Sequence, residues 1–419
     1  MFRPMERTGL SACAATPPHV PARLVRDFDL YARPGVERDF HGAWLEFQAQ
    51  AAEPIVWTAR HGGHWILLDG TRVMDAYADF ERLSSKVLVV PRPVTPPENG
   101  AVSYDPPQHG DFRMLINDGL SPRAVRGIEP QIRELARGLI EGLVARGECE
   151  LQRDFAEIVP LIVFLRLADL PLADRAMLSA WTKQITHPDG ELDHDEVMAR
   201  FIGYLQPIVA ARRGGAGNDM ITRIASGTVF GRPIEDAEAI GACAHLMMAG
   251  LDTVASFLGF VMRHLAEHAE DRQRLVRDGV SPTAVAELIR RFPLVTIMRL
   301  ARCDLDIAGV TVKAGELVAL PSALYNLDEK RFADPLAVDF TRRIDPSCTF
   351  GNGVHRCPGS NLARAEVRII LEEWLRLIPD FTVAPDAPPT IAGGFVGTVS
   401  ALHLRWEPIG VTLHEEVTA

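Results

Sequence analysis

The sequence predicts a mainly α-helical fold with small β-sheets, and three observations support this prediction. Apolar residues recur at helical spacing over much of the chain, in segments at residues 122–146, 154–168, 173–186, 195–213 and 234–266. Short alternating runs that predict strands lie at residues 55–60, 64–68, 304–307, 310–312, 317–320 and 402–406. Residues 242–260 are apolar on nearly every side, so the long helix that contains them must be buried.

The chain is expected to form one domain preceded by an arm. Residues 1–36 carry Pro17, Pro18 and Pro21 and predict an irregular N-terminal arm that wraps on the body. The length of 419 residues alone would suggest two or three domains, but residues 37–419 show neither a repeat nor a flexible linker. Six prolines in residues 87–107 exclude a regular helix there and predict a long loop, a kind that is often functional.

Composition narrows the classes of function. The net charge of −11 disfavours nucleic acid or an anionic membrane as the main partner. We find no apolar run near the roughly 20 residues that a membrane-spanning helix needs, and the first residues lack the apolar core of a signal peptide. The cysteines are scattered without a CxxC pair, which fits the cytoplasm and makes a structural zinc site improbable; they are Cys13, Cys149, Cys243, Cys303, Cys348 and Cys357.

The run FGNGVHRCPG at residues 350–359 is the most informative motif. Three glycines within nine residues let the backbone bend tightly and present N–H groups toward the sulfur of Cys357. Pro358 suits a first helical position, and a helix over residues 358–377 would stabilise a thiolate by its dipole. A lone cysteine is more often a buried, inert residue, so the alternative is a structural cysteine in a glycine-bearing loop.

With this spacing, Phe350-Gly-x-Gly-x-x-x-Cys357-x-Gly359 resembles the haem-binding signature of the cytochrome P450 family. The resemblance covers nearly the whole chain and is strongest to the bacterial camphor hydroxylase subfamily. It implies the cytochrome P450 fold with its long central helix over the haem, haem b (protoporphyrin IX iron) as cofactor, and Cys357 as the iron ligand, with Phe350 and Gly351 at the cofactor.

The resemblance implies a structural brace and a proton-delivery pair. Glu287 and Arg290 lie three residues apart on one helix face and would pair with Arg342, or with Arg343 in its place, to support the cysteine loop. Alone, such a pair is usually a solvated surface bridge. Asp252 would relay protons and Thr253 would orient the group that receives them; otherwise Thr253 caps a kink and Asp252 pairs with an arginine.

Cofactor and substrate contacts also follow from the resemblance. The propionate carboxylates of haem would be bound by His109, Arg113, Arg299 and His355, any one of which alone would be read as surface charge. Residues at matching substrate positions are Val89, His245, Met248, Ala249, Val295, Ile297, Phe395 and Val396. Residues 91–103 lack the tyrosine that holds the ketone of camphor in the resembled enzyme, so camphor is not the expected substrate.

His245 stands where the resembled enzyme has an apolar residue. It lies on one helix face with Asp252 and Thr253 and would donate a hydrogen bond to a substrate carbonyl, although a lone histidine in a buried helix more often bonds a backbone carbonyl. We therefore predict a hydroxylase of a small apolar terpenoid or norisoprenoid ketone, such as an ionone. The alternatives are a camphor-type monoterpene hydroxylase, a peroxide-driven peroxygenase and a haem-based sensor.

Electrons must come from outside the chain, which carries neither a dinucleotide fingerprint nor a cysteine set for an iron–sulfur cluster. A separate [2Fe-2S] ferredoxin with its reductase is implied, acting on a cytoplasmic monomer. Its docking patch would consist of Arg113, Arg343, Arg356, Arg364 and Arg368, unless these arginines form an ordinary charged face.

Overall fold

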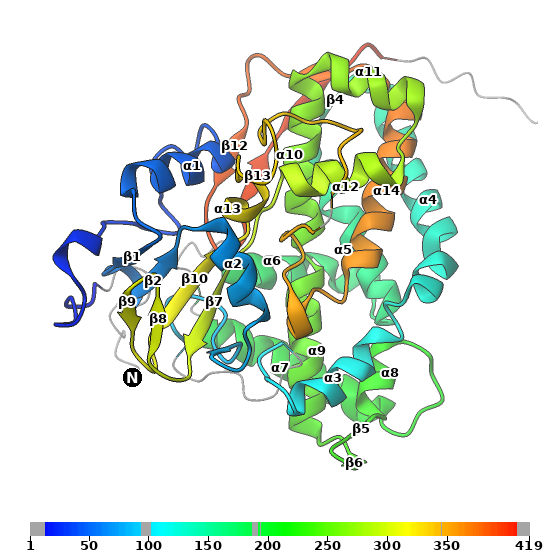
Figure 1. Cartoon of the computed structure of the whole chain (residues 1–419). Helices are drawn as coiled ribbons and strands as arrows, with labels where there is room; N and C mark the ends of the chain where they lie inside the picture. Colours follow the sequence, from blue (N-terminus) through cyan, green and yellow to red (C-terminus); the bar gives the residue numbers. More distant parts are fainter. Residues whose placement is uncertain (1–12, 94–101, 187–191, 193, 345, 409–419) are drawn as a thin grey trace, which may run out of the picture.

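The structure, a computed structural model, describes residues 13–93, 102–186, 192, 194–344 and 346–408. Its helices are α1 (Phe40–Ala51), α2 (Gly70–Ala78), α3 (Gln108–Asn117), α4 (Pro122–Val144), α5 (Ile158–Leu167), α6 (Arg175–Thr186), α7 (His194–Arg212), α8 (Met220–Ala225), α9 (Asp236–Gly250), α10 (Thr253–Glu267), α11 (Ala269–Asp278), α12 (Pro282–Arg291), α13 (Ala323–Asn326) and α14 (Ser360–Leu377). The predicted mainly helical fold with small sheets is confirmed, and Figure 1 shows the helices gathered on one side of a smaller strand-rich part.

The largest sheet has the strand order β1-β2-β10-β7-β3. The strands within the described residues are β1 (Ile55–Thr58), β2 (His64–Leu67), β3 (Leu83–Ser84), β4 (Glu148–Glu150), β5 (Thr228–Val229), β6 (Arg232–Pro233), β7 (Thr296–Ala301), β8 (Leu305–Ile307), β9 (Val310–Val312), β10 (Leu317–Pro321), β11 (Thr382–Val383), β12 (Thr390–Ala392), β13 (Thr398–Ala401) and β14 (His403–Arg405). The predicted hairpin at Gly62 and Gly63 is confirmed as β1 and β2, whose Trp57 and Trp65 are opposite each other. Strands β2 and β10 of this sheet pack on α2.

The predicted long central helix is present and is broken once. The helices α9 and α10 follow each other along one line (Figure 1), with Leu251 and Asp252 between them. The segment Asp236–Glu267 is long and apolar enough to cross a membrane, but 67% of its most apolar window is buried inside the protein. It is therefore the core helix of this fold. Close packing occurs at Gly250, where an added Cβ would lie 2.6 Å from the ring of Phe164.

The proline-bearing stretch and the arm are irregular. The described parts of residues 87–107 contain no helix or strand, while Pro96 and Pro97 lie outside the described residues. Within residues 13–36 the arm buries Leu24, Phe28 and Leu30 in the core and has a single 3-10 turn. The arm thus contributes to the core, and the division at residue 36 stays a prediction.

The helix after Cys357 begins later than predicted. It starts at Ser360 with Gly359 as its N-cap residue, so Pro358 lies in the turn before it rather than at its first position. The difference of two residues places Cys357 in the loop, three residues ahead of the first helical residue.

Candidate functional site

Cys357 lies at the end of a loop folded on itself by backbone hydrogen bonds. The N–H of Cys357 donates to the carbonyl of Phe350 (2.8 Å), and that of Gly351 donates to the carbonyl of Cys348 (2.9 Å). Gly351 and Gly353 have φ of +70° and +67°, a region that favours glycine. At Gly353 a Cβ would also come within 2.7 Å of the backbone of Ala78. Two of the three glycines are thus required by the loop geometry.

The pKa of the Cys357 thiol is raised, whereas the sequence predicted that the following helix would stabilise the thiolate. Its side chain is accessible to solvent, yet protein atoms fill most of the surrounding volume. Burial raises the pKa of its thiol, while the N–H of Gly359 and the guanidinium groups of Arg113 and Arg364 lower it without reversing the shift. Proximity to the helix therefore does not by itself ionise this thiol. A metal cation bound to Cys357 would supply the missing stabilisation, because a coordinating thiol is deprotonated.

Glu287 and Arg290 form the fully buried pair that the sequence suggested. Nε and Nη2 of Arg290 donate to the two carboxylate oxygens of Glu287, at 2.7 and 2.8 Å. Nε of Arg342 reaches the same carboxylate at 3.2 Å, so Arg342 rather than Arg343 is the third member. Neither Glu287 nor Arg290 is exposed, so the alternative of a solvated surface bridge is wrong here.

Asn326 connects this pair to the cysteine loop, a contact that no sequence pattern indicates. Nη1 of Arg290 donates to the carbonyl of Asn326 (2.9 Å). The Asn326 side chain accepts from the N–H of Cys348 (2.8 Å) and donates to Oγ1 of Thr349 (2.6 Å). The loop that carries Cys357 is thereby bonded to the Glu287 and Arg290 pair through one buried amide.

His109, Arg299 and His355 come together near Asp105. The rings of His109 and His355 are 4.3 Å apart, and Nε2 of His355 lies 3.4 Å from Oδ1 of Asp105 without hydrogen-bond geometry. Arg299 is 2% exposed and its guanidinium donates to the carbonyl of its neighbour Met298. Burial lowers the pKa of His109 to about 4, assisted by His355 and Arg113, so at neutral pH His109 is an uncharged donor.

Arg113 contacts the cysteine loop directly. Its Nη2 donates to the carbonyl of Arg356, and burial lowers its pKa. Arg364 stacks over the ring of Phe350, with its guanidinium carbon 4.6 Å from the ring centre. Arg368 instead pairs with Glu129 (2.7 Å) and Glu372 (3.2 Å), so its charge is neutralised within the α4 and α14 interface.

The residues expected for proton delivery lie at the break in the central helix. Oγ1 of Thr253 donates to the carbonyl of Ala249, 3.1 Å away. Asp252 is 7% exposed and has a non-helical backbone (φ −126°, ψ −32°). Thr253 therefore bonds back into the preceding turn, and its hydroxyl oxygen still has lone pairs that can accept from another donor.

The expected substrate residues come from four segments. Val295 bridges Val396, and the N–H of Thr296 donates to the carbonyl of Phe395 (3.0 Å), so strand β7 holds the 395–396 segment. The N–H of Met298 donates to the carbonyl of Leu88 (2.9 Å), which places the 88–90 segment beside the same strand. His245, Met248 and Ala249 share one face of α9, and Ile297 is half-buried on β7.

His245 makes the hydrogen bond that core histidines usually make. Its Nδ1 lies 2.9 Å from the carbonyl oxygen of Gly241, one turn earlier in α9. Because a carbonyl only accepts, Nδ1 carries the hydrogen. In the neutral ring Nε2 is then an acceptor, so the expected donation to a substrate ketone requires the protonated ring.

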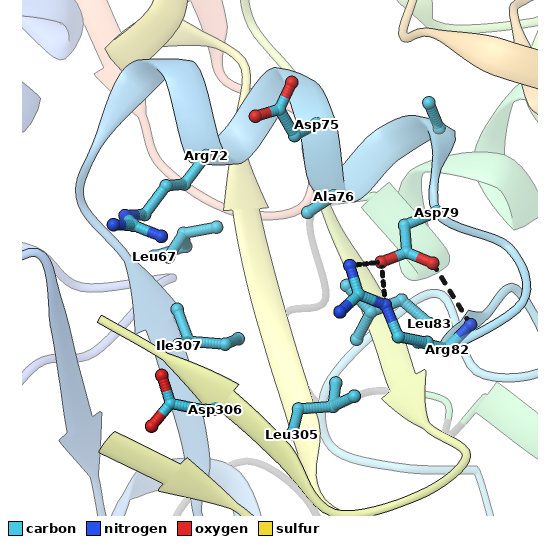
Figure 2. Close-up of a pocket in the computed structure, with 11 residues that line it drawn as sticks. Leu67, Arg72, Asp75, Ala76, Asp79, Arg82, Leu83, Leu305, Asp306 and Ile307 are labelled. Atoms are coloured by element: carbon cyan, nitrogen blue, oxygen red, sulfur yellow. Dashed lines mark hydrogen bonds and ion pairs between the residues drawn. The ribbon is translucent and has the colours of Figure 1, made fainter. Parts of the chain in front are cut away.

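A separate hollow of about 380 Å³ lies between α2 and β8. Figure 2 shows its apolar side chains, with Arg82 paired to Asp79 at the edge. Its lining residues are Leu67, Arg72, Asp75, Ala76, Ala78, Asp79, Arg82, Leu83, Leu305, Asp306 and Ile307. No histidine or cysteine lines this hollow, so it offers no soft metal ligand and we assign no chemistry to it.

The site fits haem on two counts. Among the described residues no three His, Cys, Asp or Glu side chains gather to hold a metal ion, so Cys357 suits an iron whose other ligands come from a macrocycle. Nε2 of His109 is buried without a hydrogen-bond acceptor among the described residues, and the ring of His355, whose Nε2 lies 3.4 Å from Asp105, and the buried Arg299 lie beside it. Such a set of donors fits the carboxylates of haem propionates. Together they define a haem-thiolate protein.

Comparison with known proteins gives the family. A model described as cytochrome P450 matches residues 282–397, which include Glu287, Arg290 and Cys357. The chain is 31% identical to a probable cytochrome P450 127A1 of Sinorhizobium fredii, over 93% of this chain and 96% of that protein. The chain belongs to the cytochrome P450 family.

Two solved structures are still more similar. The crystal structure of cytochrome P450 CYP101C1 is 42% identical with a TM-score of 0.86, and that of CYP101J2 is 38% identical with a TM-score of 0.85. Each comparison covers 94% of this chain and 100% of the other chain. The expected resemblance to the camphor hydroxylase subfamily is thus confirmed, and the protein is a haem-thiolate monooxygenase.

Proposed function

We propose that this monooxygenase hydroxylates a small apolar terpenoid or norisoprenoid, with ketones of the ionone type as first candidates, in the cytoplasm. The observation that carries the proposal is the convergence of Val295, Phe395 and Val396, held by the β7 contacts, with the 88–90 segment beside them. The aliphatic and aromatic side chains of these residues favour an apolar ligand. When bound, a thiolate-ligated haem supplies the oxygen activation for inserting one oxygen atom.

The cofactor contacts follow from the donors of the site. Cys357 would ligate the iron, and His109, Arg113, Arg299 and His355 would hold the propionates. Nε2 of His109 is buried without an acceptor among the described residues, which supports this assignment. Phe350 and Gly351, which shape the loop through bonds to Cys357 and Cys348, would fix the loop against the cofactor.

The proton-delivery role belongs to Asp252 and Thr253. Asp252 lies at the break between α9 and α10, where its carboxylate is almost fully buried. Thr253 donates its own hydroxyl hydrogen to Ala249 and would accept a hydrogen bond from a bound water, and so hold a proton source in the pocket. Asp252 would deliver the proton, and the hydroxyl oxygen of Thr253 would hold the water that receives it.

The protein would receive electrons from a separate [2Fe-2S] ferredoxin with its reductase. The proposed docking patch consists of Arg113, Arg356 and Arg364, which lie in or against the cysteine loop. Arg368 is left out of the patch because it pairs with Glu129. An acidic ferredoxin would meet these guanidinium groups in a weak, salt-sensitive complex.

His245 would contact the substrate from α9, where it shares a face with Met248 and Ala249. The test therefore pairs each ketone with the alcohol of the same skeleton. Relatives named for other apolar substrates, such as a methyl-branched lipid omega-hydroxylase of Mycobacterium tuberculosis at 28% identity, support the class of reaction and not this choice.

The test is a screen of the ferric haem spectrum against matched pairs of alcohols and ketones. β-Ionone, β-ionol, camphor and borneol are titrated, and the bound compounds are turned over with ferredoxin and its reductase. The proposal expects a substrate shift and a hydroxylated product with ionone or ionol. Camphor turnover alone would favour the camphor-type alternative, and peroxide-driven turnover without ferredoxin the peroxygenase. Binding without any turnover would favour a sensor.

A further inference from the structure

We infer that Tyr31, in the N-terminal arm, is a positioning residue for the substrate pocket. Its hydroxyl donates to the carbonyl of Val90, 2.6 Å away. Its ring lies against Gly394, where an added Cβ would come within 3.2 Å of the ring carbon Cδ1. One tyrosine therefore contacts the neighbour of Val89 and the neighbour of Phe395, two residues of the proposed pocket. The inference rests on the proposed function for the roles of those two residues.

The position of Tyr31 is itself fixed by its surroundings. Oδ1 of Asp29 accepts hydrogen bonds from the N–H groups of Tyr31 (2.9 Å) and Ala32 (3.2 Å) and also lies 2.8 Å from Nε2 of His61. The ring of His61 meets the ring of Tyr31 edge-on, with the centres 5.2 Å apart. A side chain held on this many sides transmits its position to what it touches, rather than adapting to it.

The two segments that Tyr31 contacts are otherwise each attached to strand β7. The carbonyl of Leu88 accepts from Met298, so Val89 lies between one bond to β7 and one bond to Tyr31. The carbonyl of Phe395 accepts from Thr296, so Phe395 lies between β7 and the Gly394 contact with Tyr31. Tyr31 thus contacts both segments in addition to their contacts with the 294–298 stretch, and it sets how far their side chains stand apart.

The end of α6 meets the same point. The Cβ position of Gly394 lies 3.0 Å from the carbonyl oxygen of Thr186, the last residue of α6. The arm, the 88–90 segment, the 393–397 segment and the end of α6 therefore adjoin one aromatic ring. A purely structural role for the arm predicts that removing the hydroxyl lowers stability alone, whereas a positioning role predicts altered ligand binding at unchanged stability.

The experiment uses the holoenzyme and the Tyr31→Phe variant, which removes one hydroxyl and keeps the ring. The matched control is Tyr204→Phe, since that half-buried hydroxyl makes one hydrogen bond, to Asp174 (2.7 Å), away from the pocket segments. Three probes are titrated spectroscopically. Imidazole is small and reports on the iron, whereas 4-phenylimidazole and β-ionone are large enough to contact the pocket walls. Haem content and thermal unfolding are measured in parallel.

We expect Tyr31→Phe to weaken binding of 4-phenylimidazole and β-ionone about fivefold, the effect of losing one hydrogen bond, and to leave imidazole within twofold. Tyr204→Phe should leave all three within twofold. Equal affinities of Tyr31→Phe and wild type for the two large probes would overturn the inference. Failure of β-ionone to bind wild type would count against the proposed substrate alone, because 4-phenylimidazole still tests Tyr31.

A second variant covers the case in which Tyr31→Phe loses haem. Gly394→Ala places a methyl group against the Tyr31 ring and the Thr186 carbonyl without removing the hydrogen bond. It should weaken the two large probes in the same way. Unchanged binding in Gly394→Ala would overturn the positioning role.

Discussion

Arg290 donates to both carboxylate oxygens of Glu287, and neither side chain has any exposed surface. The remaining Arg290 hydrogens reach the carbonyls of Asn326, Pro335 and Ala337, so the guanidinium is satisfied on every edge. Removing one partner of such a pair leaves an uncompensated charge in a region without water, which costs more than the pair itself contributes.

Glu287→Gln should therefore destabilise the protein by about 3–5 kcal/mol and lower its haem content. Urea unfolding and the haem-to-protein absorbance ratio measure the two effects. Glu267→Gln is the control, since Glu267 pairs with Arg263 on the surface and should cost less than about 1 kcal/mol. Equal losses in both variants would contradict the importance of burial.

Asn326→Ala should detach the cysteine loop from that pair. The amide accepts from the N–H of Cys348 and donates to Thr349, and a buried N–H left without its acceptor costs about 1–3 kcal/mol. We expect a partial loss of the thiolate-ligated form in the ferrous carbon monoxide spectrum, at a stability cost smaller than that of Glu287→Gln. An unchanged spectrum would show that the loop holds Cys357 without Asn326.

Thr253→Ala separates proton handling from folding. The hydroxyl bonds only the carbonyl of Ala249 among the described residues, and alanine favours a helix, so the unfolding free energy should change by less than about 0.5 kcal/mol. Product formed per ferredoxin oxidised should fall several-fold while peroxide release rises. Thr253→Ser keeps the hydroxyl and should retain most of the coupling. Full coupling in Thr253→Ala would remove Thr253 from the mechanism.

The sequence predicted the local parts of this site well, because they depend on neighbours along the chain. Each of these parts involves residues only a few positions apart: the glycines of the cysteine loop, the i,i+3 pair of Glu287 and Arg290, and the residues around Asp252. Helices α1 and α2 and strand β7 were not predicted, since short elements carry too few periods of apolar spacing.

Long-range contacts were the part that sequence patterns did not reveal. Asn326 is a polar residue in a four-residue helix, and Tyr31 acts through carbonyl and glycine neighbours 59 and more residues away. A backbone carbonyl is the same in every residue type, so the sequence does not indicate which carbonyl a side chain will contact. Conversely, Arg368 fitted a surface patch by spacing along α14 but pairs with Glu129 of α4, because packing of the two helices decides its partner.

Glu373 on α14 should contribute stability that is lost in acid. Burial would raise its pKa, but hydrogen bonds from Arg137, Arg133 and Arg376 outweigh burial and hold the pKa at about 2. Because the folded pKa lies below the ordinary value of 4.5, the contribution is present above pH 4.5 and disappears as the pH falls toward 2. Glu373→Gln should cost roughly 2 kcal/mol at pH 7 and clearly less at pH 3, by urea unfolding. The same cost at both pH values would argue for a packing effect instead.

Glu366 lies two turns earlier on the same helix and should act in the opposite direction. It is 2% exposed, and burial alone raises its pKa to about 8. Between the ordinary pKa of 4.5 and pH 8 the unfolded chain loses this proton while the folded chain keeps it, so stability falls as the pH rises through that range. Glu366→Gln is neutral at every pH and should match wild type at pH 4.5. At pH 8 and above it should be more stable by roughly 4 kcal/mol. Thermal unfolding of the two holoproteins from pH 4.5 to 9 measures the difference, and parallel curves would show that Glu366 is ionised in the folded protein at neutral pH.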